Sequence, residues 1–139
     1  MAEGGDRDAL ASGEGGGETG GFGFPRAARI TGSEEIRGLF RRGKRRRTRH
    51  LDAFVSPSPA AYPRLGVVVP KHKRRIVDRN RVKRHLREIG RTVLLPALRD
   101  AGLPLDVLLR ARPEAYGATF TELRDELRGL AEELCSRAP

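Results

Sequence analysis

The chain has 139 residues, with no tryptophan and a single cysteine. Its 28 lysines and arginines exceed 18 acidic residues, which gives a formal net charge of +10 and a pI near 11.1. One cysteine, Cys135, excludes an internal disulfide framework and suits a reducing compartment, and the lack of a long apolar run argues against a membrane-spanning protein.

The surplus of positive charge favours a polyanion as the partner. Arginine greatly outnumbers lysine, and a planar guanidinium can bind phosphate oxygens in a bidentate manner or stack on a base. Nucleic acid therefore ranks above a membrane surface, for which an aromatic and basic anchor would be expected. No signal peptide is apparent, so we expect a cytoplasmic protein.

The first 24 residues differ in composition from the rest. They contain nine glycines and five acidic residues against one arginine. Such a segment cannot bury enough apolar surface to offset the entropy lost on ordering. We therefore predict a disordered acidic tail over residues 1–24 and one folded domain over residues 25–139.

The first half of this domain is predicted to form a helix followed by two strands. Ser33 is expected to cap a helix whose apolar face holds Ile36, Leu39 and Phe40. A run of nine residues, seven of them cationic, then precedes a predicted strand over residues 51–55. The β-branched segment 64–69 is bounded by prolines and predicts a second strand, buried on both faces or nearly so.

Residues 78–91 separate apolar from charged side chains completely. At about 100° per residue, an α-helix places Val82, Leu86, Ile89 and Val93 on one side and Asn80, Arg84, Arg87 and Arg91 on the other. Asp78 is the expected N-cap, and Glu88 is the only later acid of the segment. A basic face can serve for solubility alone, but such faces usually mix signs. The pattern favours a helix that packs on a core and presents arginines to an anion. We expect it to end at about Leu95 or slightly past it, because Pro96 disturbs it and Gly102 with Pro104 closes the segment.

The remaining residues predict one more strand and one more helix. Alternating apolar residues indicate a strand over 105–111. Thr119 and Glu122 form a capping box, and the helix after it carries core leucines at positions 123, 127, 130 and 134. With room for a short strand near residues 75–77, the order predicts an α+β or α/β sandwich of one sheet and few helices.

No independent catalytic or metal site is apparent. His50, His72 and His85 lack metal-ligand spacing, and neighbouring cations are expected to disfavour protonation of His85. Asp125 and Glu126 are expected on the solvent face of the last helix. A self-sufficient nuclease would need clustered carboxylates, and a DNA-binding regulator would need base-reading side chains on its recognition helix.

Several stretches, in order and spacing over roughly residues 25–135, resemble the protein subunit of bacterial ribonuclease P. They are residues 40–43, 64–71, 77–84, 87–88 and 91, and the Arg-Asn-Arg signature at 79–81 is the most specific of them. The resemblance implies an α+β fold: a single small α/β sandwich with about four strands, three helices and a left-handed βαβ crossover, similar to the second domain of a small-subunit ribosomal protein.

The resemblance also implies a function. In this family the RNA subunit is the catalyst that removes the 5′ leader from precursor tRNA, and the protein binds the leader and stabilises the active RNA fold and its Mg2+. No catalytic residue and no metal ligand is therefore expected in this chain, because the RNA subunit binds most of the Mg2+. The expected partners are the catalytic RNA and the leader, with one monomeric protein per RNA and no membrane.

Residue by residue, the resemblance implies two sites. The predicted RNA-binding residues are Lys71, Arg79, Asn80, Arg81, Lys83, Arg84, Arg87 and Arg91. The predicted leader-binding cleft contains Ile36, Phe40 and Phe54, whose aromatic members could stack on bases of any sequence or could simply belong to the core.

Three features depart from the family pattern or have no counterpart in it. Residues 73–75 are bulky and charged where a small turn is usual, and Ile36 stands where an aromatic residue is common. The acidic tail has no counterpart, and one hypothesis is that it screens the basic domain from unrelated RNAs. The alternative function is a structural, ribosomal-type RNA-binding protein with no role in tRNA maturation.

Overall fold

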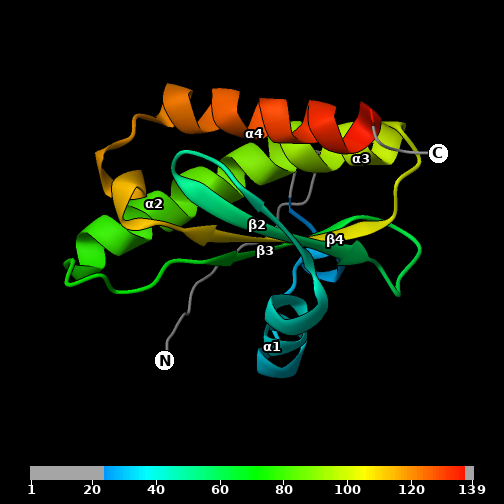
Figure 1. Ribbon diagram of the computed structural model, residues 1–139, viewed down its shortest axis with the longest axis horizontal. Coiled ribbons are helices and arrows are strands. Elements are labelled where there is room, and N and C mark those ends of the chain that lie inside the picture. Colours follow the sequence, from blue (N-terminus) through cyan, green and yellow to red (C-terminus); the bar gives the residue numbers. More distant parts are fainter. Residues whose placement is uncertain (1–23, 137–139) are drawn as a thin grey trace.

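The structure, a computed structural model, describes residues 24–136, so residues 1–23 of the predicted acidic tail and residues 137–139 of the predicted domain lie outside it. Four strands form one sheet with helices on both faces (Figure 1). The strands are β1 (Lys44–Arg47), β2 (Leu51–Pro57), β3 (Arg64–Val68) and β4 (Leu105–Ala111). The α-helices are α1 (Ser33–Arg42), α2 (Ile76–Ile89), α3 (Leu95–Asp100) and α4 (Phe120–Ser136). Short 3-10 helices span Arg26–Ala28 and Pro113–Gly117, and a π-helical turn spans Gly90–Leu94.

The sheet has the order β1-β2-β4-β3 and is mixed. β1 pairs with β2 and β2 with β4 in antiparallel fashion, whereas β3 and β4 are parallel. The crossover from β3 to β4 runs through α2, the π turn and α3, which together form one long bent helix. This helix and α4 cover one face of the sheet, and α1 lies on the opposite side (Figure 1). The predicted α+β fold with a four-stranded sheet and three helices is confirmed.

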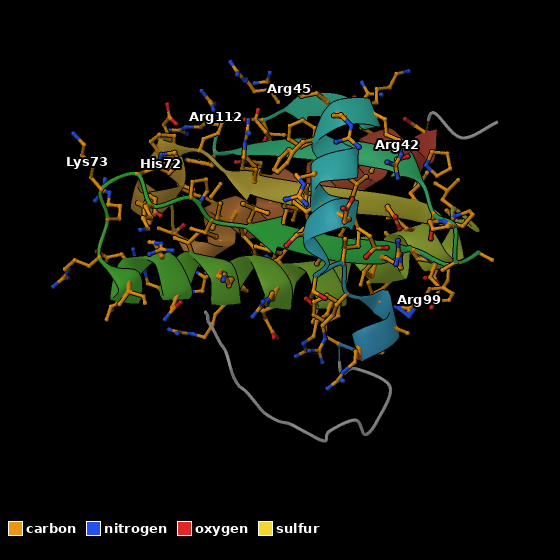
Figure 2. All side chains as sticks on the ribbon, turned by 90° about the horizontal axis from the view of Figure 1, so that it is seen from below. Arg42, Arg45, His72, Lys73, Arg99 and Arg112 are labelled. Atoms are coloured by element: carbon orange, nitrogen blue, oxygen red, sulfur yellow. The ribbon has the colours of Figure 1, made fainter. Side chains whose placement is uncertain are left out.

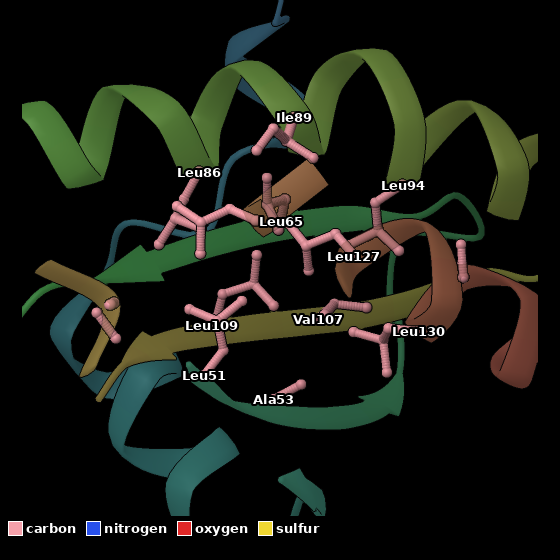
Figure 3. Close-up of a cluster of buried hydrophobic side chains, with 14 of the residues drawn as sticks. Leu51, Ala53, Leu65, Leu86, Ile89, Leu94, Val107, Leu109, Leu127 and Leu130 are labelled. Atoms are coloured by element: carbon pink, nitrogen blue, oxygen red, sulfur yellow. The ribbon is translucent and has the colours of Figure 1, made fainter. Parts of the chain in front are cut away.

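The central strand β4 contributes to two separate cores, one on each face of the sheet. Val107 and Leu109 belong to the larger core between the sheet, α2 and α4 (Figure 3), and Leu108 belongs to the smaller core under α1. The predicted leucine stripe of α4 and the apolar stripe of α2 are buried in the larger core: Leu123, Leu127, Leu130, Leu134, Val82, Leu86 and Ile89. Burial of so many large side chains fixes α2 on the sheet.

The fourth strand forms from the basic run rather than near residues 75–77. Arg75 is instead the N-cap of α2, and Ile76 and Val77 are its first two residues. Hydrophobic periodicity could not predict β1, because all four of its residues are cationic. Arg45 and Arg47 each place a guanidinium nitrogen 3.3 Å from Asp52 on β2. Cross-strand ion pairs therefore take the place of apolar contacts on that face of β1. The predicted strand over 64–69 lies at the other edge of the sheet and is only partly buried.

Two predicted N-caps are wrong. α1 begins at Ser33 with Gly32 as its N-cap, and α2 begins two residues before Asp78 with Arg75 as its N-cap. Neither cap makes a side-chain hydrogen bond. Asp78 lies in the first turn of α2, where its carboxylate interacts favourably with the positive end of the helix dipole.

α4 begins at the predicted capping box. The Thr119 amide donates to Glu122 Oε1 at 2.8 Å, and the Glu122 amide donates to Thr119 Oγ1 at 3.1 Å. Asp125 is exposed as predicted, but Glu126 is half-buried: His50 Nδ1 lies 2.7 Å from its Oε1, and the His50 amide donates to its Oε2. Glu126 therefore fastens the β1–β2 turn to α4, which no periodic pattern could reveal.

The long helix continues past Pro96 to Asp100, a few residues beyond the predicted end, and stops before Gly102 as predicted. Pro96 falls in the first turn of α3, where a missing N–H costs little, and the π turn lies directly before it. Gly90 begins this turn at a point where the helix lies very close to β3. A Cβ atom on Gly90 would overlap Leu65 Cδ2.

We expect Gly90→Ala to lower the free energy of unfolding by about 1–3 kcal/mol, because Leu65 is fully buried and cannot move aside without overpacking the core. Denaturant unfolding measures the change. The matched control is Gly129→Ala in α4, where a Cβ meets nothing within 4 Å and the better helix propensity of alanine should stabilise by about 0.5–1 kcal/mol. Equal effects of the two substitutions would contradict the close approach of α2 to β3.

The turn between β3 and α2 is tight although it contains no glycine. The Arg74 amide donates to the Lys71 carbonyl at 2.7 Å, and the two central residues have positive φ angles, 45° at His72 and 62° at Lys73. This is the pattern of a type I′ turn, which disfavours residues with a Cβ. His72 and Lys73 therefore adopt a backbone conformation that is energetically unfavourable for residues with a Cβ atom.

Lys73→Gly should raise the free energy of unfolding by about 1 kcal/mol, because glycine adopts a positive φ without steric penalty. Thermal unfolding at low salt is the appropriate measurement. Lys71→Gly removes the same charge at a residue without positive φ, so it should destabilise or have no effect. Stabilisation by both substitutions would instead point to relief of charge repulsion.

Candidate nucleic-acid interface

The exposed side of α2 and the turn after it carries many cations and few free acids. Both carboxylates of the helix form ion pairs. Asp78 lies 3.5 Å from Arg75, and Glu88 lies 2.8 Å from Arg91. Arg81 donates to the backbone carbonyl of Tyr116 at 3.3 Å. The other candidate side chains of α2 form no ion pair or hydrogen bond within residues 24–136: Arg79, Asn80, Lys83, Arg84 and Arg87.

The uncompensated cations repel one another. Burial lowers the pKa of Lys83, and the charges of Arg87 and Arg79 lower it further. Burial and the charge of Arg29 likewise lower the pKa of Arg87. The pKa of His85 is also lowered, by burial and then by two arginines of the same helix, as predicted. A bound anion would relieve this repulsion, so the surface favours phosphate groups.

Two of these cations line a groove of about 210 Å³, whose other walls come from β3, α1 and the segment 24–31. Lys83, Arg87 and Arg29 supply its positive charge. Ile36 of α1 and the strand residue Val67 supply part of its apolar wall. The structure therefore brings one predicted leader-binding residue and two predicted RNA-binding residues into the same groove.

The other two predicted leader-binding residues form an aromatic pair on the α1 face of the sheet. The rings of Phe40 and Phe54 meet edge to face, with centroids 5.0 Å apart. Phe54 is buried at 6% exposure, whereas Phe40 is half-buried. The Arg110 guanidinium lies over both rings. Sequence analysis missed Arg110. A signal was present, because an arginine in one largely apolar strand and an aspartate, Asp52, in another can form a cross-strand pair.

Lys71 is exposed in the turn that leads into α2. Tyr116 holds this turn: its hydroxyl donates to the Pro70 carbonyl at 2.8 Å, and the Arg74 guanidinium lies 4.9 Å from its ring centroid. Figure 2 shows the turn, marked by His72 and Lys73, at one end of the molecule. Sequence analysis missed Tyr116 because its supporting role depends on contacts distant in the chain.

Within residues 24–136, no group of three or more histidine, cysteine or acidic side chains lies where it could hold a metal ion. The carboxylates of α2 are engaged by arginines, and the surrounding positive charge would repel a divalent cation. No helix in the same part of the chain combines the length and hydropathy needed to cross a bilayer.

Solved structures share this fold. The Staphylococcus aureus RNase P protein matches 78% of this chain and 96% of its own with a TM-score of 0.65 at 21% identity. The RNase P protein from Thermotoga maritima matches 76% of this chain and 96% of its own with a TM-score of 0.62 at 23% identity.

Comparison by sequence leads to the same family. The Ribonuclease P family model matches residues 24–135. The ribonuclease P protein component of Micrococcus luteus is 42% identical over 116 residues, which cover 76% of this chain and 86% of that protein. The corresponding protein of Methylococcus capsulatus is 37% identical over 97 residues, covering 68% and 71%. The chain therefore belongs to the ribonuclease P protein family, as the protein component of the endoribonuclease that matures the 5′ ends of tRNA.

Proposed function

We propose that the cationic side of α2 binds the catalytic RNA of ribonuclease P. The observation that carries this proposal is the set of α2 cations that form no ion pair or hydrogen bond with any residue from 24 to 136: Arg79, Lys83, Arg84 and Arg87. Two of them, Lys83 and Arg87, have lowered pKa values because of burial and neighbouring charge. Phosphates would displace counterions and relieve the repulsion, which gives strong and salt-sensitive binding. The proposed contacts are Lys71, Arg79, Asn80, Arg81, Lys83, Arg84, Arg87 and Arg91.

The groove beside α1 would bind the single-stranded 5′ leader. Ile36 lines this groove, and Phe40 and Phe54 form the aromatic pair on the same helix and the adjoining sheet. Apolar and aromatic surfaces bind bases with little sequence preference, which suits an enzyme with many precursor tRNAs. Because Phe54 is buried, its role would be to support Phe40 rather than to stack on a base itself.

Hydrolysis would be carried out by the RNA, with Mg2+ held by RNA phosphates in the cytoplasmic holoenzyme. Positive side chains of α2 would reduce the repulsion between RNA strands, so that less Mg2+ is needed for the active fold. Asn80 would add a hydrogen-bond donor and acceptor with a defined direction. One protein monomer would serve each RNA, binding the catalytic RNA on α2 and the leader beside α1.

The protein should restore cleavage of precursor tRNA by a bacterial ribonuclease P RNA at low Mg2+. Arg84→Ala/Arg87→Ala should weaken its binding to that RNA by roughly 100-fold, since two charge-assisted contacts are lost. The measurement is single-turnover cleavage across a protein titration. The matched control is Arg99→Ala/Arg128→Ala, which removes two exposed arginines outside the proposed interface.

The control variant should behave as the wild type does. If the wild-type protein binds RNA tightly but never restores cleavage, the proposed function is wrong, and a structural RNA-binding role fits instead. If both double variants lose activity equally, net charge rather than the α2 surface would be responsible.

Salt dependence provides a second test of the same surface. The slope of log Kd against log salt concentration should become shallower by about 1.5 in Arg84→Ala/Arg87→Ala, because each lost phosphate contact removes about 0.7–0.9 from the slope. Filter binding of the catalytic RNA over a salt series gives both slopes. An unchanged slope would show that these arginines do not contact phosphates.

A further inference from the structure

Arg110 occupies an unusual position on the α1 face of the central strand. Its guanidinium carbon lies 5.2 Å from the ring centroid of Phe40 and 5.3 Å from that of Phe54. The side chain is nonetheless 35% exposed. The guanidinium thus lies within cation–π distance of both rings while part of the side chain remains accessible to solvent.

Asp52 anchors Arg110 without neutralising its surroundings. The two residues face each other across β2 and β4, and Arg110 Nη2 donates to Asp52 Oδ2 at 3.2 Å. The other carboxylate oxygen accepts hydrogen bonds from Arg45 and Arg47. One carboxylate is therefore shared by three guanidinium groups, which leaves two positive charges in excess.

The carboxylate remains charged in this cluster. Burial alone would raise the pKa of Asp52, but hydrogen bonds from Arg110 and Arg47 and the charge of Arg45 outweigh it, so the pKa is lowered. A structural ion pair requires only one arginine. Arg110 has five N–H donors. Among residues 24–136, it donates only one hydrogen bond, to Asp52.

A hollow adjoins Arg110. This hollow of about 300 Å³ is lined by Arg110, Asp52 and Arg47, and by Pro70 and His72 from the turn into α2. Arg112 also lines it, but its guanidinium donates to the carbonyls of the β1–β2 turn. The hollow therefore extends from Arg110 and Asp52 to the turn that carries Lys71.

We infer that Arg110 is a leader-binding residue that contacts a phosphodiester group of the single-stranded 5′ leader. This inference rests on the proposed function, because it assumes that the leader passes the α1 face of the sheet. A phosphate oxygen would accept hydrogen bonds from the free edge of the guanidinium, while Phe40 and Asp52 hold the group in place. Arg45 and Arg47 add positive charge beside the contact.

The test uses reconstituted holoenzyme with Arg110→Leu or Arg110→Lys. Arg110→Leu should weaken binding of a precursor tRNA with a leader of several nucleotides about tenfold, the loss of one charge-assisted contact, and should leave mature tRNA binding unchanged. Arg110→Lys keeps the charge and should recover part of the affinity. Arg99→Leu, at an exposed site distant from this hollow (Figure 2), should bind both RNAs as the wild type does.

A second measurement uses the wild-type protein and does not depend on folding of a variant. Replacing leader phosphates one at a time by neutral methylphosphonates should reveal one position where lost charge weakens binding about tenfold, and this sensitivity should vanish with Arg110→Leu. Equal losses for precursor and mature tRNA, no loss at all, or a sensitive phosphate that persists in the variant would overturn the inference. If the wild type itself fails to distinguish the two RNAs, the proposed function fails instead.

Discussion

Burial of one side of α2 forces its other side to hold several cations close together, with only Asp78 and Glu88 as acids on the helix itself. Complete burial of Val82, Leu86 and Ile89 contributes about 1.5–3 kcal/mol for each side chain. Repulsion between two cations near a protein surface amounts to about 1–4 kcal/mol at about 4 Å and decreases with distance. The core therefore outweighs the repulsion, and the folded domain keeps a charge arrangement that an RNA can relieve. Gly90 adds to this constraint, because it allows the helix to approach β3 closely.

The two faces of the sheet support different surfaces, and β4, one of its two inner strands, contributes to both. On one face, Val107 and Leu109 pack against the helices that present the cations. On the other, Leu108 packs under α1 while Arg110 remains partly exposed above the aromatic pair. The same strand thus supports the proposed contact with the catalytic RNA on one side and the proposed contact with the leader on the other.

Features with strong local signals were predictable from the sequence. The apolar stripes of α2 and α4 and the Thr119 capping box depend on spacing within one helix, and all are present. β1 was not predictable, because its cationic residues resemble a loop and are stabilised by Asp52, a residue of another strand. The positions of Glu126 and Arg110 were not predictable for the same reason. Glu126 pairs with His50, and Arg110 lies over the aromatic pair, and both partners are distant in the sequence. Residue type indicated a basic RNA-binding helix, but only the tertiary structure shows which of its cations pair with another of the residues 24–136.

The most direct test asks which RNA lies beside each surface. In a Cys135→Ser background, Arg37→Cys on α1 and Thr92→Cys on the π turn after α2 each allow an iron chelate to be attached at an exposed residue. Hydroxyl radicals generated in the holoenzyme with precursor tRNA then cut the RNA nearest to each position. We expect cuts in the 5′ leader from Arg37→Cys and in the catalytic RNA from Thr92→Cys. Leader cuts absent from the α1 position, or catalytic RNA cuts absent from the α2 side, would contradict the assignment of the two surfaces.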